Sequence, residues 1–193
     1  MKSVMISIKP KWCELIASGQ KTIEVRKSRP KLETPFKCYI YCVKDPDKLW
    51  VLNEQCRQKY DGLTTVCANL VKSESLYEGN GKVIGEFVCD EILQFNHDDY
   101  NSPAYDISDD DLNRTCLGQE DLYRYANGKT LYGWHISDLV IYDNPRELSE
   151  FLRINRECWY ADLGLAKRDC PECKNAECFV SRPPQSWCYV ERG

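Results

Sequence analysis

The sequence lacks three features that would place it in a class at once: a long apolar run, an internal repeat and an excess of positive charge. The apolar stretch in residues 1–10 is too short for a signal peptide or a membrane span. We therefore expect a cytoplasmic protein with no membrane contact. The formal net charge of -4, from 26 Lys and Arg against 30 Asp and Glu, argues against a protein that coats nucleic acid non-specifically. A local basic groove stays open.

The composition favours one globular domain, but the cysteine content is high. Of the 193 residues, 42% are hydrophobic and 29% are charged, which is enough for one domain with a proper core. Without an export signal, the 12 cysteines are expected to be reduced thiols, metal ligands or buried small side chains rather than a disulfide framework. Five of them lie among apolar neighbours and are interpreted as core residues: Cys13, Cys38, Cys42, Cys67 and Cys89.

The stretch from residue 21 to 26 has the sharpest pattern in the chain. A strand is expected directly after Lys21, with Ile23 and Val25 on one face. Glu24 and Arg26 then share the opposite face. A carboxylate and a guanidinium together, with an ammonium beside them, indicate either a solvated strand edge or the lining of a polar cleft. We adopt the cleft interpretation.

The remaining elements follow from apolar periodicity and from the positions of proline and glycine. Strands are expected over residues 4–8, 38–43, 82–92 and 130–142, and helices over 10–18, 48–60 and 120–126. A further helix is expected to start at Asn144 and Pro145, with Glu147 completing a capping box. Gly85 indicates a bulge or a close approach to the backbone. Residues 182–191 are interpreted as an extended arm that adds a last strand.

At least four short strands interrupted by short helices, with little βα rhythm, predict an α+β fold built on a small mixed β-barrel. Gly19, Lys21, Glu24 and Arg26 also fit the signature G-x-K-x-x-E-x-R. With this signature the sequence resembles the ASCH-domain proteins, a branch of the PUA-like superfamily. Residues 85–87 and 134–138 support this resemblance. The form with residues 144–148 and 182–191 is similar to ASCH proteins encoded by phages, prophages and gut bacteria.

The resemblance implies a domain plan and a ligand class. A PUA-like mixed β-barrel with short surrounding helices would cover residues 1–155, with an insertion at about 44–81. Residues 156–193 would form a Cys-rich C-terminal extension that docks on the barrel. The cleft would be lined by Lys21, Glu24 and Arg26. Because ASCH and PUA-like domains are associated with RNA and modified-nucleoside recognition, the expected partner is RNA or a modified nucleoside or nucleotide.

The same resemblance leaves two rival functions open. One ASCH branch hydrolyses the amide of N4-acetylcytidine with a lysine, a threonine and a glutamate, and another is ribonuclease-like. Lys21 matches the lysine, Glu24 stands where the threonine nucleophile falls, and Glu86 is a loose match for the glutamate. If the protein is a hydrolase, these three residues are its candidate catalytic groups. The other rival is a phage–host protein-interaction module.

Further ligand-binding candidates lie beside the cleft strand and on a later strand. Arg26 could hold a phosphate or a carbonyl in fork geometry. Lys27 and Arg29 belong to a short basic turn, which is either a local anion-binding surface or a solvated turn. His135 is one of only 2 histidines, and it is either a ligand-binding residue or a hydrogen-bonded core residue.

The cysteines near the end of the chain have a different pattern from those in the core. Cys170 and Cys173 form a C-x-x-C pair, followed by Cys178 and Cys188. Four thiolates in a short polar segment favour a structural Zn²⁺ site, although the spacing is irregular and Cys158 could replace one ligand. An iron–sulfur cluster uses the same ligands. Reduced cysteines without metal are the alternative.

Overall fold

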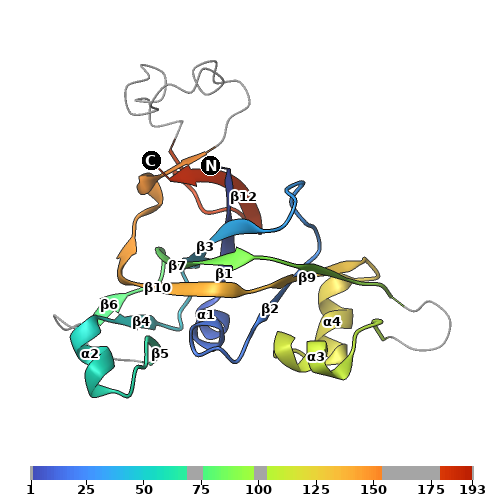
Figure 1. The fold of residues 1–193 in the computed structure, drawn as a ribbon, viewed down its shortest axis with the longest axis horizontal. Coiled ribbons are helices and arrows are strands. Elements are labelled where there is room, and N and C mark those ends of the chain that lie inside the picture. The colour runs from blue at the N-terminus through green and yellow to red at the C-terminus, as the bar shows by residue number, and fades with distance from the viewer. Residues whose placement is uncertain (1, 69–75, 98–103, 154–178, 193) are drawn as a thin grey trace, which may run out of the picture.

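The computed structural model describes residues 2–68, 76–97, 104–153 and 179–192, and these contain twelve strands and four α-helices (Figure 1). The strands are β1 Ser3–Ile8, β2 Ile23–Arg26, β3 Phe36–Cys42, β4 Leu49–Leu52, β5 Thr65–Cys67, β6 Leu76–Glu78, β7 Val83–Cys89, β8 Ile92–Phe95, β9 Leu131–His135, β10 Ser137–Arg146, β11 Phe151–Arg153 and β12 Trp187–Arg192. The helices are α1 Pro10–Ala17, α2 Glu54–Lys59, α3 Asp109–Thr115 and α4 Gln119–Ala126.

The strands form three sheets. The largest has six strands in the order β10-β7-β3-β1-β12-β11, and two smaller sheets have the orders β2-β9-β8 and β5-β4-β6. In the large sheet β1 and β3 are parallel, whereas the other pairs are antiparallel. The fold is therefore mixed α+β, as expected, but the described strands do not close into one barrel.

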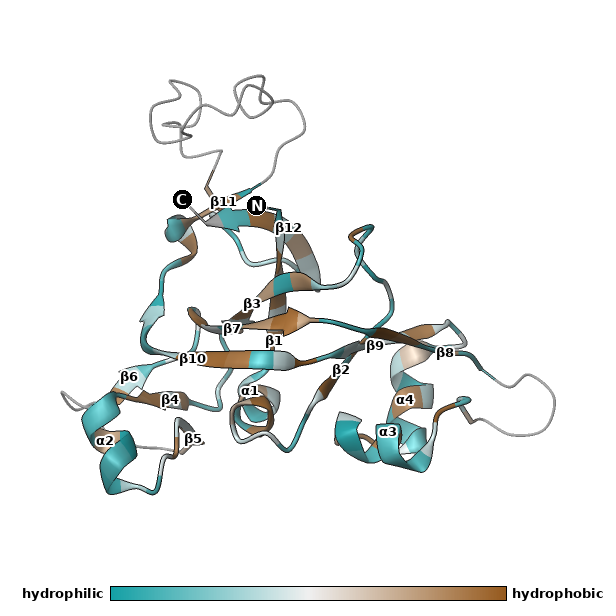
Figure 2. Ribbon diagram, viewed as in Figure 1, coloured by the Kyte–Doolittle hydropathy of each residue, from teal (hydrophilic) through white to brown (hydrophobic). Residues whose placement is uncertain are grey.

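The central strands of the large sheet are covered on both faces, as the apolar run at residues 38–43 predicts. Cys38 and Ile40 pack into one cluster with α1 and Trp134, while Tyr39 and Tyr41 pack into a second cluster on the other face. Figure 2 shows this contrast in hydropathy, with brown central strands and largely teal helices α2 and α3 at the periphery. Two-sided burial explains why this run does not alternate.

The cysteines predicted to be core residues lie in or against the first cluster. Cys13, Cys38, Cys42 and Cys89 are buried, and Cys67 is partly buried. Burial raises the pKa of Cys67 and of Cys89 to about 12, so these two thiols stay protonated at neutral pH.

Helix α1, which precedes strand β2, forms as its sequence predicts. Pro10 occupies the first turn of α1, and Gly19 takes a positive φ of 76° just after the helix ends. The backbone N–H of Lys21 then donates to the carbonyl of Leu15 at 2.9 Å. This turn brings β2 alongside α1 and fixes the start of the strand.

The small sheet β2-β9-β8 is covered on one face by α3 and α4. Ile23 and Val25 point into this apolar cluster together with Phe95 and Leu122. Ser108 caps α3 by accepting a hydrogen bond from the N–H of Asp111, and α4 ends at Asn127 in the left-handed conformation, as expected.

Three predictions about elements are wrong in part. The helix expected over 48–60 is limited to α2, because residues 49–52 form the buried strand β4 between β5 and β6. The strand expected over 82–92 ends at Cys89, and Ile92 starts β8 in another sheet. The strand expected over 130–142 is likewise divided into β9 and β10, which belong to different sheets. Gly85 does sit at a close approach: a Cβ there would lie 2.4 Å from the Val140 carbonyl oxygen.

The helix expected to start at Asn144 and Pro145 does not form. Strand β10 continues through both residues to Arg146, and only a short 3-10 turn follows at Leu148–Glu150. β10 is an edge strand whose pairing with β7 is irregular between Ile141 and Arg146, so a proline without an N–H is tolerated there. In place of a helix cap at Asn144, the backbone N–H of Glu147 donates to the side chain of Glu150 in this short turn.

The last strand forms, and it lies inside the large sheet rather than at its edge. β12 pairs with β1 on one side and β11 on the other. The Trp187 ring packs 5.9 Å from that of Trp134, and its Nε1 donates to the Ser28 hydroxyl at 3.0 Å. Most of the predicted Cys-rich extension, including residues 156–178, lies outside the described residues. Within the described part, no helix is long and apolar enough to cross a membrane.

Candidate functional site

Lys21 is buried at the start of β2, and its ammonium is surrounded by oxygen atoms. The side chain is 2% exposed. Its Nζ donates to the carbonyls of Ile23 at 2.9 Å and Thr115 at 2.6 Å, and lies 3.4 Å from Oε2 of Glu24. Thr115 is the last residue of α3, so the Lys21 side chain links this helix to strand β2 by hydrogen bonds.

The number of acceptors around Lys21 limits what it can do. An ammonium has three N–H bonds, and here three oxygen atoms lie within reach of them. No donor is left over for a ligand. The lysine is therefore best suited to position Glu24, whose carboxylate it approaches from one side.

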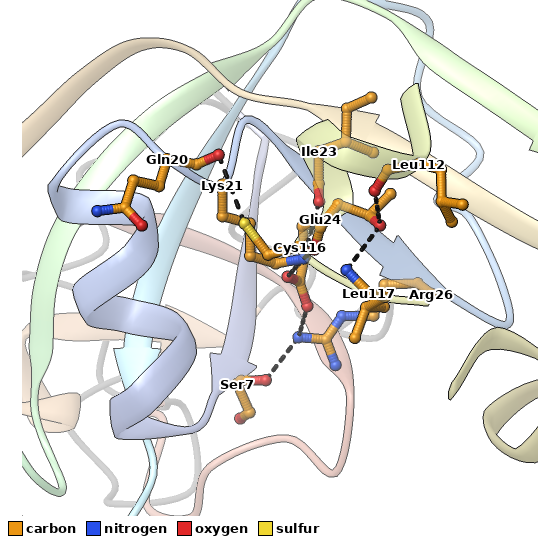
Figure 3. Close-up of polar contacts among 10 residues, drawn as sticks. Ser7, Gln20, Lys21, Ile23, Glu24, Arg26, Leu112, Cys116 and Leu117 are labelled. Carbon is orange, nitrogen blue, oxygen red and sulfur yellow. Dashed lines mark hydrogen bonds and ion pairs between the residues drawn. The ribbon is translucent and has the colours of Figure 1, made fainter. Parts of the chain in front are cut away.

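Glu24 and Arg26 form a buried ion pair on the face of β2 that strand parity predicts. Nη2 of Arg26 lies 2.9 Å from Oε1 of Glu24 and donates to the Ser7 carbonyl at 2.6 Å. Figure 3 shows the guanidinium between Glu24 and Ser7. The two side chains are 9% and 10% exposed, respectively. The cleft interpretation of this face is therefore consistent with the geometry, and a solvated edge is not.

One donor of Arg26 is buried and has no partner. Nε has no hydrogen-bond acceptor among the described residues. A buried N–H without an acceptor is unfavourable by about 1–3 kcal/mol, and native proteins keep few such groups. The unpaired Nε is the feature of this site that calls for an acceptor from beyond the described residues.

These residues line a pocket of about 340 Å³ between β1, α1, β2 and α4. Its lining consists of Ser7, Ile8, Lys9, Trp12, Lys21, Glu24, Val25, Arg26, Leu117, Asp121 and Tyr125. Two aromatic side chains, Trp12 and Tyr125, contribute flat apolar surface. Burial raises the pKa of Tyr125, Arg26 acts in the opposite direction, and Glu24 reinforces the increase. The phenol is therefore a neutral hydroxyl at physiological pH.

The two residues of the basic turn differ in their relation to this pocket. Lys27 is exposed, and its Nζ lies 4.8 Å from the centre of the Tyr125 ring, beside the pocket. Arg29 stacks on Tyr132 at 5.9 Å and lines a separate surface hollow of about 600 Å³. The two basic residues of the turn thus lie at different sites, Lys27 beside the pocket and Arg29 at the separate hollow.

Glu86 and His135 lie apart from the pocket. Glu86 accepts hydrogen bonds from Lys37 at 2.6 Å and from the Tyr142 hydroxyl, on the face of the large sheet that carries Tyr39. Nδ1 of His135 is 2.6 Å from Asp90 in a partly exposed pair. Neither residue lines the pocket with Lys21. The structure therefore does not bring Glu86 to Lys21 as an acid–base partner.

The proposed zinc ligands are mostly beyond what the structure describes. Cys170, Cys173 and Cys178 fall outside the described residues. Cys188 lies in β12 opposite Met5, packed against the second apolar cluster, and burial raises its pKa. Within residues 2–68, 76–97, 104–153 and 179–192, no group of three or more His, Cys, Asp or Glu could hold a metal. Zinc binding stays a prediction.

Sequence reasoning missed several contributors to the site, among them Ser7, Thr115, Leu117 and Tyr125. Ser7 and Thr115 contribute through backbone carbonyls, which have no residue-type signal. Tyr125 lies in the helix expected over residues 120–126. Nothing local to residue 125 indicates that it meets β2.

The chain matches one family model and several solved structures. A family model for the ASCH domain matches residues 6–102. A crystal structure of ASCH from Zymomonas mobilis has a TM-score of 0.46 at 17% identity, covering 98% of this chain and 87% of that one. A tyrosine-to-phenylalanine variant of that protein has a TM-score of 0.44 at 17% identity, covering 99% of this chain and 91% of that one. A serine-to-alanine variant has a TM-score of 0.45 at 16% identity, covering 98% of this chain and 88% of that one. Curated proteins gave no significant match.

Proposed function

The chain belongs to the ASCH domain family, and from this premise we propose that the pocket at Lys21, Glu24 and Arg26 binds RNA through a single nucleotide. The observation that carries the proposal is the buried Nε of Arg26, which has no acceptor within the described residues. A base or phosphate oxygen would supply one. ASCH domains have a PUA-like fold that is often associated with RNA binding, which makes RNA the natural ligand class.

The size and walls of the pocket favour a nucleoside. A volume of about 340 Å³ is at the lower end of the range for small-molecule pockets. Trp12 and Tyr125 offer aromatic surface, and proteins that recognise single-stranded RNA commonly stack unpaired bases on such rings. A folded helix could not enter, so the ligand would be an unstacked base.

Glu24 gives the pocket a hydrogen-bond acceptor that is already oriented. Each of its oxygens faces one cation, Lys21 or Arg26. A carboxylate has about four acceptor sites, so two pairings leave capacity for a donor from the ligand. An exocyclic amine or ring N–H of a base fits this role.

Lys27 is placed to contact the backbone of a longer RNA. It is exposed and lies next to the Tyr125 ring. Phosphate contacts position a strand without reading its sequence. Lys27 should therefore matter for oligonucleotides and not for free nucleosides.

The geometry gives less support to a hydrolase that uses Lys21 and Glu86 together. Each N–H of Lys21 already has an oxygen within reach, and Glu86 is paired with Lys37 elsewhere. A reaction in the pocket would have to rely on Glu24, and the binding experiment is designed to detect it.

The test is equilibrium binding of the four unmodified nucleosides and of short single-stranded RNAs, with mass spectrometry of each mixture afterwards. Arg26→Lys is the test variant, because it keeps the positive charge next to Glu24 but removes Nε. Arg124→Lys is the matched control, because Arg124 is exposed on α4 and pairs only with Glu120 among described residues. We expect Arg26→Lys to weaken binding by about 10- to 100-fold and the control to leave it unchanged.

Two results would overturn the proposal. One is the absence of nucleoside and RNA binding by folded wild-type protein. The other is equal affinity of wild type and Arg26→Lys. A new product in the mass spectrum that folded Glu24→Gln fails to form would replace binding by hydrolysis as the function of the pocket.

A further inference from the structure

We infer that the open edge of strand β2, at the backbone of Val25, reads the hydrogen-bonding edge of the base. This inference rests on the proposed function and adds a recognition mechanism to it. It depends on three observations: the position of β2 in its sheet, the direction of its backbone groups, and the contacts of its neighbours.

Strand β2 is at the edge of the sheet β2-β9-β8, so one side of its backbone has no strand beside it. The N–H of Ile136 donates to the Thr22 carbonyl at 2.9 Å, which directs that carbonyl toward β9. In an antiparallel pair the direction alternates by residue. The backbone groups of Glu24 and Arg26 therefore face β9, and those of Ile23 and Val25 face away from it.

The Lys21 contact supports this assignment independently. Lys21 Nζ, which is not part of the sheet, donates to the Ile23 carbonyl at 2.9 Å. On the far side of the sheet the N–H of His135, the residue opposite Ile23, donates to Glu91 rather than to β2. Both contacts place Ile23 and Val25 in the set whose N–H and C=O groups point to the open edge.

Val25 is the residue of this edge that remains available. The Ile23 carbonyl is taken by Lys21, and β2 ends at Arg26, whose backbone groups face β9. For Val25 no side chain or loop among the described residues takes up its N–H or its C=O. The Val25 side chain is buried with Phe95 on the other side, yet the residue lines the pocket. Its backbone is thus what the pocket presents.

The occupant that fits this edge is a planar group with a donor beside an acceptor. A residue in the hydrogen-bonded position of a ladder exchanges one N–H and one C=O with a single partner. Because the Ile23 carbonyl is engaged and β2 ends at Arg26, the edge offers one such pair and cannot extend into a ladder with a peptide strand. A nucleobase has the required pair on its Watson–Crick edge, and the Trp12 and Tyr125 rings supply stacking surface.

The first test follows the amide hydrogens of β2 by hydrogen exchange in NMR. In the free protein, the Val25 amide should exchange faster than those of Glu24 and Arg26, which face β9. When a nucleoside that binds is added to saturation, exchange at Val25 should slow by about tenfold or more, while Glu24 and Arg26 serve as internal controls. If Val25 is as protected as its neighbours before ligand is added, the assignment of the edge is wrong.

The second test uses nucleosides methylated at one atom. Methylation at ring nitrogen one of purines or ring nitrogen three of pyrimidines blocks the Watson–Crick edge. Methylation of carbon five of pyrimidines leaves that edge intact and is the matched control. We expect a loss of about 10- to 100-fold for the first group and no loss for the control.

The outcomes separate this inference from the proposed function. If neither nucleosides nor short RNAs bind, the proposed function fails and this inference fails with it. If a nucleoside binds in an Arg26-dependent manner but tolerates methylation of its Watson–Crick edge, only the strand-edge inference is overturned. Protection of the Val25 amide by an extended peptide, without any by nucleosides, would overturn it in favour of strand addition.

Discussion

Glu24 and Glu86 are carboxylates on neighbouring parts of one fold, and their surroundings differ in a way that separates their roles. Glu24 is buried between Lys21 and Arg26 and lines a pocket whose arginine has an N–H without a partner among the described residues. Glu86 is partly buried on a sheet face between Lys37 and Tyr142, away from that pocket. A glutamate on a strand is therefore a weak guide to function by itself. The side chains that surround each carboxylate determine its role.

The largest effect is expected when the buried charge network loses one cation. Lys21→Met should lower the free energy of unfolding by about 3–5 kcal/mol, because Glu24 keeps one partner fewer and two carbonyls lose their donor. Urea denaturation at neutral pH measures this.

The control for this prediction is Arg124→Ala, which removes an ion pair whose side chains are 70% and 78% exposed. It should change stability by no more than about 0.5 kcal/mol. A loss from Lys21→Met as small as that of the control would show that the network contributes little to the fold.

The comparison between the two carboxylates can be tested directly by neutralising each in turn. Glu24→Gln should weaken nucleoside binding by about 10- to 100-fold, since a charged acceptor in the pocket becomes a neutral amide. Glu86→Gln should leave nucleoside affinity unchanged. Calorimetric titration of both folded variants measures this, and equal losses would mean that the pocket extends to the Glu86 face.

The smallest effect is expected at the tyrosine beside Glu86. Burial raises the pKa of Tyr142 above its usual range, and the hydrogen bond to Glu86 adds to the increase. Above about pH 10 the unfolded chain loses the phenol proton while the folded chain retains it, so unfolding becomes more favourable as pH rises. Tyr142→Phe removes this contribution.

We therefore expect the variant to lose stability less steeply than wild type between about pH 9.5 and pH 11. At pH 7 the substitution should change stability by about 1 kcal/mol or less. Denaturation curves at both ends of the range measure the difference. Parallel pH dependence of the two proteins would contradict the account of this hydrogen bond.

Much of the local structure could be predicted from the sequence because it depends on neighbouring residues. The parity of β2 and the helix over residues 10–18 are of this kind. The helix expected at Asn144 failed because a local capping pattern lost to strand pairing with β7. Local signals of that type are valid only where tertiary contacts do not compete.

The site was only half predictable for the same reason. Lys21, Glu24 and Arg26 lie within six residues, and their shared face follows from the strand period. Their partners come from distant segments: Ser7 from β1, Thr115 from α3 and Tyr125 from α4. A backbone carbonyl has no sequence signature, so neither the saturation of Lys21 nor the unpaired Nε of Arg26 could be foreseen.

The most direct test of the central claim is an NMR titration of the wild-type protein with the four unmodified nucleosides. If the pocket is the binding site, amide shifts will be confined to residues that line it, such as Ser7, Val25 and Leu117, and the Nε–H signal of Arg26 will move with them. Shifts centred on Lys37 and Glu86, or no shifts at saturating concentration, would contradict the claim.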